Sequence, residues 1–500
     1  MHMLNFLSFF VIAPFIGSVL VALTGKFNEK FAKAIFVAVS LFLASLSLSC
    51  ILVTKDFGII VHKTSAILSP LYRIPLILDG FSTFMLVVSN VITFFIALFS
   101  PQYMAKYTQR WKFYALFLLL VTGMNGVILS GDILNLLICL EAASIASYAL
   151  VAFGTEKEEL EATIKYLIMS TVGAFFIILG IILLYCITHT LNMALMSSML
   201  KCQENGPLTI LAAIFFIAGF GIKAALVPFH SWLPDAHQSA PAPVSAVFSG
   251  ILIKILGIYA IVRIMFNVLG ITSFISTILT SLGIFSILFG ILYAAGQRDI
   301  KRMFAYSSIS HIGYIALGFG IGTKLAILGS LLHIFNHSAM KSLLFLNSGS
   351  IEYSTGTRDM DKLGGLRTKL PITGITSLIA SLSISGIPPF GGFFSKLLII
   401  VGAVMSGNML VAFIAVLGSM ITLAVFANFQ RNVFFSSIKE EFQNIKEAPM
   451  SMKASMLALS ILCIFGGLLL LPQFSGCFLG QAGDALLNCS KYANAILGKM

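Results

Sequence analysis

The feature that most constrains this chain is a series of long, almost uncharged apolar segments that recurs along its whole length. Only 10% of its 500 residues are charged, whereas 58% are hydrophobic. Soluble domains carry about a quarter charged residues, so a chain of this composition cannot bury its apolar surface in a soluble core. Because a helix needs about 20 apolar residues to cross a bilayer, the sequence predicts a polytopic membrane protein and excludes a water-soluble enzyme.

Windows of high hydrophobicity predict fourteen membrane-spanning helices. Helices are expected because the strands of a membrane barrel alternate polar and apolar residues and would not give continuous apolar runs. The expected fold class is therefore an all-α polytopic membrane protein. The predicted spans are 4–24, 31–53, 77–99, 112–130, 132–153, 161–187, 208–228, 240–266, 271–293, 302–322, 325–348, 371–405, 409–434 and 451–472.

The 31 lysines and arginines form no patch with interleaved aromatic residues, so the net charge of +12 does not predict a nucleic-acid partner. Counted in alternate loops, 19 of them lie on one side of the membrane and 8 on the other. Cytoplasmic loops are the richer ones in Lys and Arg, so both termini are predicted on the outer side of the cell inner (cytoplasmic) membrane. The N-terminal MHMLNFLSFF lacks the basic region and cleavage site of a signal peptide, so the first span is expected to be retained.

Four lysines and one glutamate fall inside predicted spans instead of loops, and these are Lys223, Lys254, Lys341, Lys396 and Glu141. A charge at the centre of a bilayer costs about 3 kcal/mol on insertion scales, and such residues usually line an ion path. A structural ion pair that only orients two helices is the alternative for Glu141. Snorkelling of the side chain to the membrane surface is the alternative for Lys254.

Two predicted spans are interrupted by proline and glycine. KAALVPFHSWLPDAHQSAPAPVSA begins at Lys223, and GIPPFGGFFSK ends at Lys396. Irregular backbone at membrane depth is tolerated only where it is buried in protein or lines a wet cavity. The two breaks lie five spans apart and so run in opposite directions, which indicates inverted repeats. The predicted domains are a three-helix segment at 1–111, a first repeat at 112–266, a second repeat at 271–434, and a last helix with a short outer tail at 451–500.

Histidines add titratable groups to this set. LLHIFNHSAMK places His333, His337 and Lys341 on one helix face over about 12 Å. Neutral imidazole both donates and accepts hydrogen bonds, so such a face suits proton relay. A metal site is the alternative, but it lacks a nearby carboxylate or cysteine to complete a tetrahedral set. His311, among tyrosines and serines, fits interhelical hydrogen bonding as well as relay.

Other histidines and the cysteines carry weaker signals. His230 and His237 lie in the first proline-rich break, where they could gate the cytoplasmic mouth of a path or only cap the broken helix. The 7 cysteines show no CxxC, haem or iron–sulfur spacing, so no redox centre, cofactor or metal is expected in this chain. A disulfide between Cys477 and Cys489 in the outer tail is possible, but no spacing rule requires it.

Several segments together make the chain resemble a known family over nearly its whole length. They are the glutamate span ending in SYAL, EATIKYLIMST, KAALVPFHSWLPDAHQSAPAPVSA, DIKRMFAYSSISHIGY, LLHIFNHSAMK and GIPPFGGFFSK. The chain resembles the antiporter-like subunits of respiratory complex I, called L, M and N in bacteria. The same family includes the large A-type and D-type subunits of Mrp cation/proton antiporters and subunits of membrane-bound hydrogenases.

The resemblance implies a fourteen-helix fold with two inverted five-helix repeats, each containing a broken helix. It also implies a proton pathway of buried side chains, whose positions here are Glu141, Lys223, Lys254, His333, His337, Lys341 and Lys396. Lysine at position 396, where M subunits typically carry glutamate, favours an N-like or Mrp D-like identity. The short tail after Pro472 disfavours an L-type subunit, and His189 departs from the usual family glycine in a loop.

The function expected from these residues is proton translocation within a multisubunit oxidoreductase related to complex I, such as an NADH or ferredoxin dehydrogenase or a membrane-bound hydrogenase. Electron transfer would take place in other subunits. The alternative is the D-type subunit of an Mrp Na⁺/H⁺ antiporter without a redox partner. A quinone-binding or electron-carrying subunit is disfavoured, because cofactor motifs are lacking. Expected partners are other membrane subunits, the lipid bilayer and H⁺, with Na⁺ as a second candidate ion.

Overall fold

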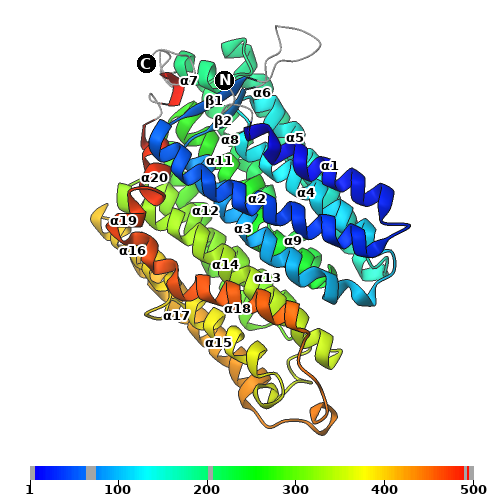
Figure 1. Cartoon of the computed structure of the whole chain (residues 1–500). Coiled ribbons are helices and arrows are strands. Elements are labelled where there is room, and N and C mark those ends of the chain that lie inside the picture. Colours follow the sequence, from blue (N-terminus) through cyan, green and yellow to red (C-terminus); the bar gives the residue numbers. More distant parts are fainter. Residues whose placement is uncertain (1–5, 64–74, 201–205, 489–491, 495–500) are drawn as a thin grey trace.

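The computed structural model describes residues 6–63, 75–200, 206–488 and 492–494, and this part of the chain is a bundle of helices with one small sheet (Figure 1). Twelve helices in the described part are long and apolar enough to cross a membrane. The twelve candidate spans are Phe6–Thr24, Glu29–Phe57, Gly80–Lys106, Arg110–Leu129, Ile133–Val151, Lys157–Thr188, Pro207–Ala224, Ala242–Leu269, Ser273–Ala295, Ile300–Ile321, Met409–Phe435 and Met450–Leu470.

The longer α-helices follow these spans closely. They are α1 (Phe9–Thr24), α2 (Glu29–Phe57), α3 (Gly80–Tyr103), α4 (Arg110–Leu129), α5 (Ile133–Val151), α6 (Lys157–Thr188), α8 (Pro207–Ala224), α12 (Ser273–Ala295), α13 (Ile300–Ile321), α14 (Lys324–Thr355), α15 (Pro371–Ser385), α16 (Gly391–Met405), α17 (Met409–Gln430) and α18 (Met450–Phe465). The shorter ones are α7 (Met193–Leu200), α9 (Trp232–Ser239), α10 (Ala242–Val247), α11 (Ala260–Val262), α19 (Pro472–Ser475) and α20 (Leu479–Leu487).

The prediction of a wholly α-helical chain is wrong at one place. Strands β1 (Ile60–Lys63) and β2 (Pro75–Leu78) pair antiparallel, with Ile60 opposite Leu78. The predicted span 77–99 therefore begins as a strand, and α3 starts only after Asp79, whose side chain caps the helix by accepting the Ser82 N–H. Four consecutive apolar residues fit a buried strand as well as the start of a helix, which is why the pattern misled.

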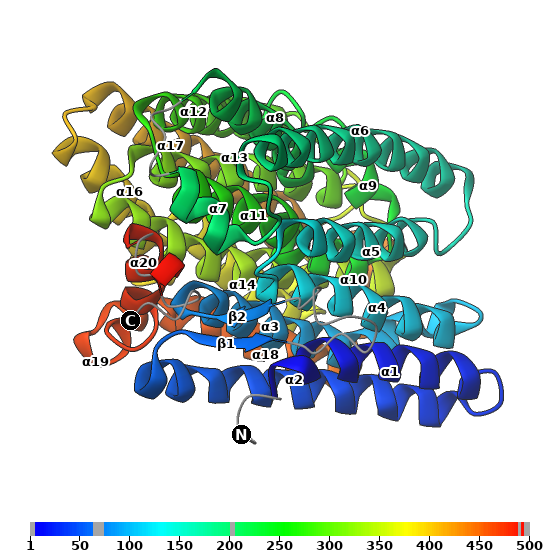
Figure 2. The same ribbon diagram turned by 90° about the horizontal axis from the view of Figure 1, so that it is seen from above.

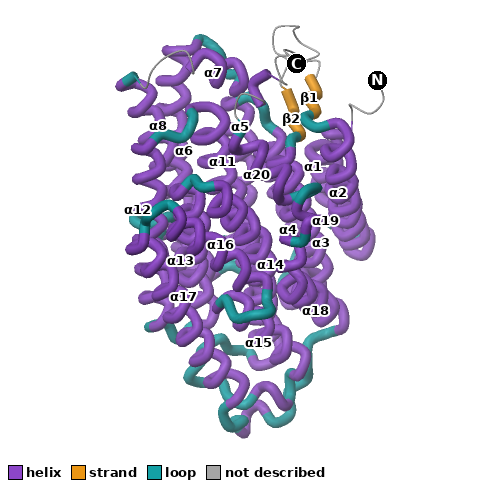
Figure 3. The backbone as a smooth tube through the Cα atoms, turned by 90° about the vertical axis from the view of Figure 1, so that its left-hand side faces the viewer, coloured by secondary structure: helices purple, strands orange, loops and turns teal. Residues whose placement is uncertain are grey.

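The two ends of the bundle differ. The hairpin side holds β1, β2 and the C-terminal α20, whereas the basic side holds the turn after α1 and the loops at 154–157, 296–299 and 356–370 (Figures 1 and 3). On the hairpin side, Asn267 donates to the Ala485 carbonyl, which ties α20 to the helix bundle. Cys477 is a free thiol and Cys489 lies outside the described residues, so the pairing of these two cysteines that the sequence left open is untested.

Glycines let neighbouring helices pack with their backbones close together. A Cβ added to Gly283 on α12 would lie 2.9 Å from the Gly313 carbonyl oxygen on α13, and one added to Gly173 on α6 would lie 3.0 Å from the Gly219 carbonyl oxygen on α8. Membrane helices lack a hydrophobic driving force between them and associate through such close contacts. These close contacts therefore fix two helices that carry predicted site residues: α8, which carries Lys223, and α13, which carries His311.

Helix α14 lies in the middle of the bundle (Figure 2) and packs against α3, α10, α13, α15, α16 and α18. Between positions 326 and 351 all of its side chains are buried except those of Leu328 and Phe335. It is not among the twelve candidate spans, because it is too polar for its length. A long polar helix enclosed by apolar ones provides the interior surface that an ion path requires.

Both predicted interruptions occur. Helix α8 ends at Ala225, whose φ of 55° is left-handed, and the chain continues through the short α9. Helix α15 ends at Gly386 with a φ of +79°, and α16 begins only at Gly391. Trp232 donates its indole N–H to the Ile222 carbonyl in the last turn of α8, which holds α9 against the first break.

Candidate functional site

Glu141 on α5 and Lys223 in the last turn of α8, two of the intramembrane charges that the sequence singles out, form an ion pair. The Lys223 ammonium lies 2.9 Å from the Glu141 carboxylate and donates to Ser144 Oγ at 3.1 Å and Ser170 Oγ at 2.5 Å. The Lys223 side chain is buried, but that of Glu141 is 32% exposed in this chain alone. A buried ammonium is thus held by one partly open carboxylate and two hydroxyls.

Lys254 lies in a helix that departs from α-helical geometry. The helix formed by residues 242–269 includes three π-helical stretches, η3 (Phe248–Leu252), η4 (Lys254–Tyr259) and η5 (Arg263–Leu269). The Lys254 ammonium is buried and donates to the carbonyls of Ser249 at 2.6 Å and Gly250 at 2.7 Å. Of the described carboxylates, none pairs with it. π-Helical turns recur at functional sites in membrane and soluble proteins.

A pair of serines joins the Lys254 helix to α13. Ser249 Oγ and Ser308 Oγ lie 2.7 Å apart, and Ser308 also donates to the Phe304 carbonyl. The same carbonyl accepts from Lys341 on α14 at 2.8 Å, and Lys341 also contacts Ser307 Oγ. Lys254 and Lys341 are therefore linked through Ser249, which offers its carbonyl to Lys254 and its hydroxyl to Ser308, and through the Phe304 carbonyl, which accepts from both Ser308 and Lys341. The sequence analysis did not single out these serines.

Three histidines form a stack next to Lys341. His311 Nδ1 lies 3.1 Å from His333 Nε2, and the His311 ring centroid lies 5.3 Å from those of both His333 and His337. All three rings are fully buried. His311, for which the sequence left two interpretations open, comes from α13 and joins the face that α14 presents. Because imidazole nitrogens both donate and accept, the stack offers adjacent proton sites.

Lys396 on α16 lies at the far end of this series. Its ammonium donates to the Ile384 carbonyl at 2.9 Å and to Ser419 Oγ at 3.1 Å, and it lies over the Tyr314 ring. Ser395, its neighbour in sequence, contacts His333 Nδ1 at 2.9 Å. Lys396 thus follows the histidines in space, with neutral oxygens around its charge.

The two histidines of the first break are separate from each other. His230 packs edge-on against Phe289, with ring centroids 4.5 Å apart, and contacts none of the predicted pathway residues. His237 on α9 is fully buried and stacks on Phe345 of α14. Within the described part of the chain, neither of its ring nitrogens has a hydrogen-bond partner. His237 therefore lies beside the central helix, whereas His230 does not.

Two further buried cations were assigned to loops by the sequence analysis, and this assignment is wrong. Lys301 and Arg263 are fully buried, and Arg263 forms a bidentate ion pair with Asp79 at 2.6 and 2.9 Å. Arg263 lies inside the predicted span 240–266, and a charge inside a span is a signal from which its burial could have been predicted. Asp79 lies 184 residues away at a span end, so nothing in the sequence paired it with Arg263.

Metal ligation finds no support in the part of the chain that the structure describes, where no three His, Cys, Asp or Glu side chains gather to hold an ion. The prediction that this chain holds no metal and no cofactor stays a prediction.

The family described as NADH:quinone oxidoreductase/Mrp antiporter, TM, matches residues 130–422, more than half of the chain. The chain belongs to this family. A second description, NADH-ubiquinone oxidoreductase (complex I), chain 5 N-terminus, matches residues 72–114. The resemblance predicted from the motifs is therefore confirmed, and all ten predicted site residues lie within the larger match.

Relatives within the NADH:quinone oxidoreductase/Mrp antiporter family carry names of both kinds. The N-type NADH-quinone oxidoreductase subunit of Desulforudis audaxviator is 36% identical over 66% of this chain and 66% of its own length. The D-type Na⁺/H⁺ antiporter subunit of Alkalihalophilus pseudofirmus is 32% identical over 97% of this chain and 98% of its own. The solved Mrp complex from Dietzia sp. DQ12-45-1b contains a chain with a TM-score of 0.91 and 26% identity, over 100% of both chains. This chain thus spans just under two thirds of the first relative and nearly all of the second.

Proposed function

We propose that this chain is a proton-translocating subunit of a multisubunit membrane complex related to complex I. The observation that carries this proposal is the succession of buried proton-bearing side chains across the bundle, from the Glu141–Lys223 pair through Lys254 and Lys341 to the histidine stack and Lys396. Electrons would be transferred by other subunits, and this chain would hold no redox centre.

The membrane arrangement is part of the proposal. Helix α14 and the broken pair α15–α16 complete fourteen spans together with the twelve candidates. The repeats comprise 112–266 and 271–434, each with one interruption, and they run in opposite directions. The basic side faces the cytoplasm, in agreement with the excess of Lys and Arg there, so both termini lie outside.

The decisive experiment is proton pumping by the native complex in sealed vesicles. Lys396→Ala and Glu141→Gln should each abolish pumping while the complex still assembles, because each removes one proton-bearing group from the series. A pH-sensitive dye in the vesicle lumen measures the pumping, and native gel electrophoresis measures the assembly. Full pumping by both variants would exclude the pathway.

A second function, Na⁺/H⁺ antiport without a redox partner, is favoured by one observation. A D-type antiporter subunit and a chain of an Mrp complex match 97% and 100% of this chain, whereas the NADH-quinone oxidoreductase relative aligns over about two thirds. A chain of the membrane-bound sulfane sulfur reductase, an archaeal respiratory membrane complex, also matches 98% of this chain, so the full-length similarities include a redox complex as well. Proton movement started by a Na⁺ pulse alone would establish this function. Movement that requires an electron donor and acceptor would establish the first.

A further inference from the structure

A cavity opens on the basic side of the bundle, between the start of α6, helix α9 and the start of α13. Its volume is about 480 Å³. It is lined by five carboxylates, those of Glu156, Glu158, Glu159, Glu161 and Asp235, and by three basic side chains. We refer to this cavity as the vestibule.

Several charges of the vestibule form ion pairs at its exposed or partly exposed rim, whereas Glu159 is buried and forms none among the described residues. Asp235 accepts from Lys165 and Arg302, both at 3.0 Å, and Lys165 also pairs with Glu161 at 2.9 Å. Glu159 is only 6% exposed, yet its Oε2 atom has no hydrogen-bond partner in the described part of the chain. A buried carboxylate that lines a cavity and has one oxygen without a partner is a site for a proton.

The surroundings of Glu159 keep its carboxylate in this place. Gly154 lies against the carboxylate, and a Cβ added at Gly154 would overlap it. The other titratable groups that face Glu159 are Glu156, Tyr107 and Lys301. Of these, Lys301 alone lies on the inner side of the vestibule.

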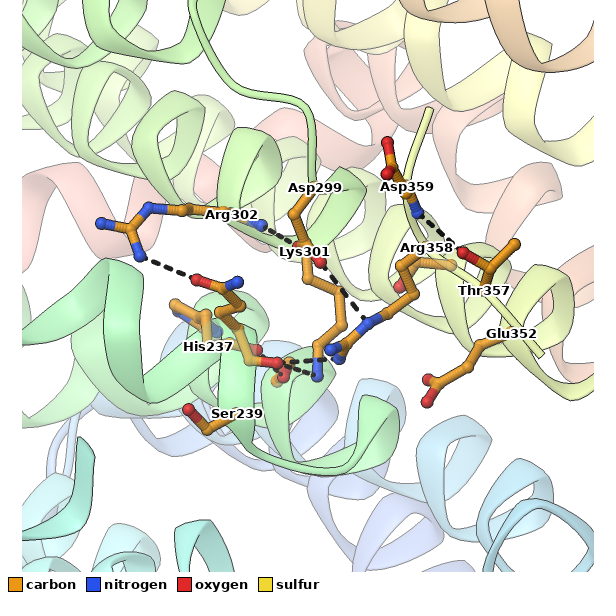
Figure 4. A network of polar contacts seen from close by, with 12 residues as sticks. His237, Ser239, Asp299, Lys301, Arg302, Glu352, Thr357, Arg358 and Asp359 are labelled. Atoms are coloured by element: carbon orange, nitrogen blue, oxygen red, sulfur yellow. Dashed lines mark hydrogen bonds and ion pairs between the residues drawn. The ribbon is translucent and has the colours of Figure 1, made fainter. Parts of the chain in front are cut away.

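Lys301 belongs to a network of polar contacts (Figure 4) that includes Gln238, a residue of the vestibule lining. The Gln238 carbonyl accepts from Lys301 at 3.2 Å and from Arg358 at 2.8 Å, and the Lys301 ammonium also contacts the Ala240 carbonyl. Arg302 donates to Gln238 Oε1 at 2.7 Å. Three cations thus surround Gln238, and Lys301 is the one that is fully buried.

The residue that precedes Gln238 of this network in sequence is His237. Its ring nitrogens are unpartnered among the described residues, and it lies within electrostatic reach of Lys301, Lys341 and Lys254. Among the described residues, no hydrogen bond joins the His237 ring to any of these lysines, although the charges of all three act on it. No other predicted site residue touches this network in the part of the chain that the structure describes.

We propose that the vestibule is the port through which protons enter the path from the basic side, with Glu159 as collecting group and Lys301 as the gate. Glu159 binds one proton from water; Lys301 gives its proton toward His237 and takes one back from Glu159, so one proton moves inward and no charge accumulates. The five carboxylates of the vestibule outnumber its three basic side chains, and this excess of negative charge raises the local concentration of protons near Glu159. This inference rests on the proposed function.

The test uses the complete complex in sealed vesicles whose basic side faces the medium. The variants are Glu159→Gln, Lys301→Met and Lys301→Arg. Matched controls are Glu440→Gln and Lys362→Met, which change exposed residues on the same side but outside the vestibule. The initial rate of proton movement per assembled complex is measured from about pH 6 to about pH 9 in the medium.

Glu159→Gln should equal the unsubstituted protein at the acidic end and be about tenfold slower at the alkaline end, because a collecting carboxylate matters most when protons are scarce. Both Lys301 variants should be about tenfold slower or worse at every pH, because Arg keeps the charge but cannot release a proton. The two controls should show the unsubstituted profile.

Two results would overturn the proposal that the vestibule is the entry port for protons. One is a Glu159→Gln profile that parallels the unsubstituted protein, and the other is a full rate in Lys301→Arg, which would mean that the charge alone suffices. Lys396→Ala in the same vesicles separates this failure from that of the proposed function. If Lys396→Ala stops pumping while the vestibule variants pump normally, only the port is wrong; if Lys396→Ala and Glu141→Gln also pump normally, the proposed function is wrong.

Discussion

Two buried ion pairs in this chain have opposite construction. Arg263 and Asp79 are joined by two hydrogen bonds, both side chains are almost fully buried, and the guanidinium lies over the rings of Phe81, Tyr259 and Tyr492. Lys223 and Glu141 are joined by one contact, and the carboxylate is partly exposed.

The difference separates a permanent pair from one that can open. Arg263 also donates to Tyr259 Oη and Asn267 Oδ1, but these partners are neutral, and neither Arg263 nor Asp79 reaches water. Breaking the bidentate pair therefore leaves a charge in the protein interior without a counter-charge. Lys223 retains two serine hydroxyls when Glu141 moves away, and Glu141 can reach water. Only the second pair is suited to change its state during transport.

Removing the carboxylate of the first pair should have the largest effect on stability. Asp79→Asn leaves Arg263 buried without a counter-charge, which should lower the free energy of unfolding by about 3–5 kcal/mol. Thermal unfolding of the purified complex measures this loss. Replacing both residues, as in Asp79→Leu with Arg263→Leu, should recover most of it; an unchanged unfolding temperature in Asp79→Asn would show that the pair does not stabilise the fold.

Replacing Lys223 by arginine, so that the Lys223–Glu141 pair resembles the Arg263–Asp79 pair, should stop transport but leave folding intact. Lys223→Arg retains the positive charge next to Glu141 but cannot give up a proton, so the pumping rate should fall about 100-fold. The matched exchange Arg263→Lys should leave the pumping rate per assembled complex nearly unchanged. Equal losses of pumping in both variants would contradict the distinction between the pairs.

A lysine outside both pairs should matter least. Lys324 is exposed at the first position of α14 on the hairpin side, and no described carboxylate pairs with it. Lys324→Ala should leave pumping and the unfolding temperature unchanged, since surface charges contribute little. A clear loss of pumping in vesicle assays would mean that charge on the hairpin side, and not only the buried residues, controls transport.

Most of the helices and one of the two pairs could be predicted from the sequence. Apolar runs reveal spans because the bilayer requires them, and an isolated Glu141 and Lys223 in such runs are conspicuous. Asp79 and Lys301 are not, because each stands at the end of a helix, where a charge is ordinarily solvated. Their burial depends on the hairpin, α20 and the polar network around Gln238, which hydropathy does not report.

The neighbours of each site residue were the least predictable part. His333 and His337 share a face by simple helical spacing, but the place of His311 between them depends on how α13 packs against α14. The Ser249–Ser308 contact joins residues 59 positions apart. Serines are common in membrane helices and their spacing carries no signal, so only the packed structure distinguishes these two.

The π-helical stretches around Lys254 carry a consequence for how this helix tolerates changes in length. Each wide turn holds an extra residue, so the helix is wound out of step with an ordinary α-helix on either side. Deleting a single residue between positions 248 and 253 would turn everything beyond it by about 100°. Lys254 and Arg263 would then both face away from their hydrogen-bond partners. The π-helical winding therefore sets the direction in which both side chains leave the helix.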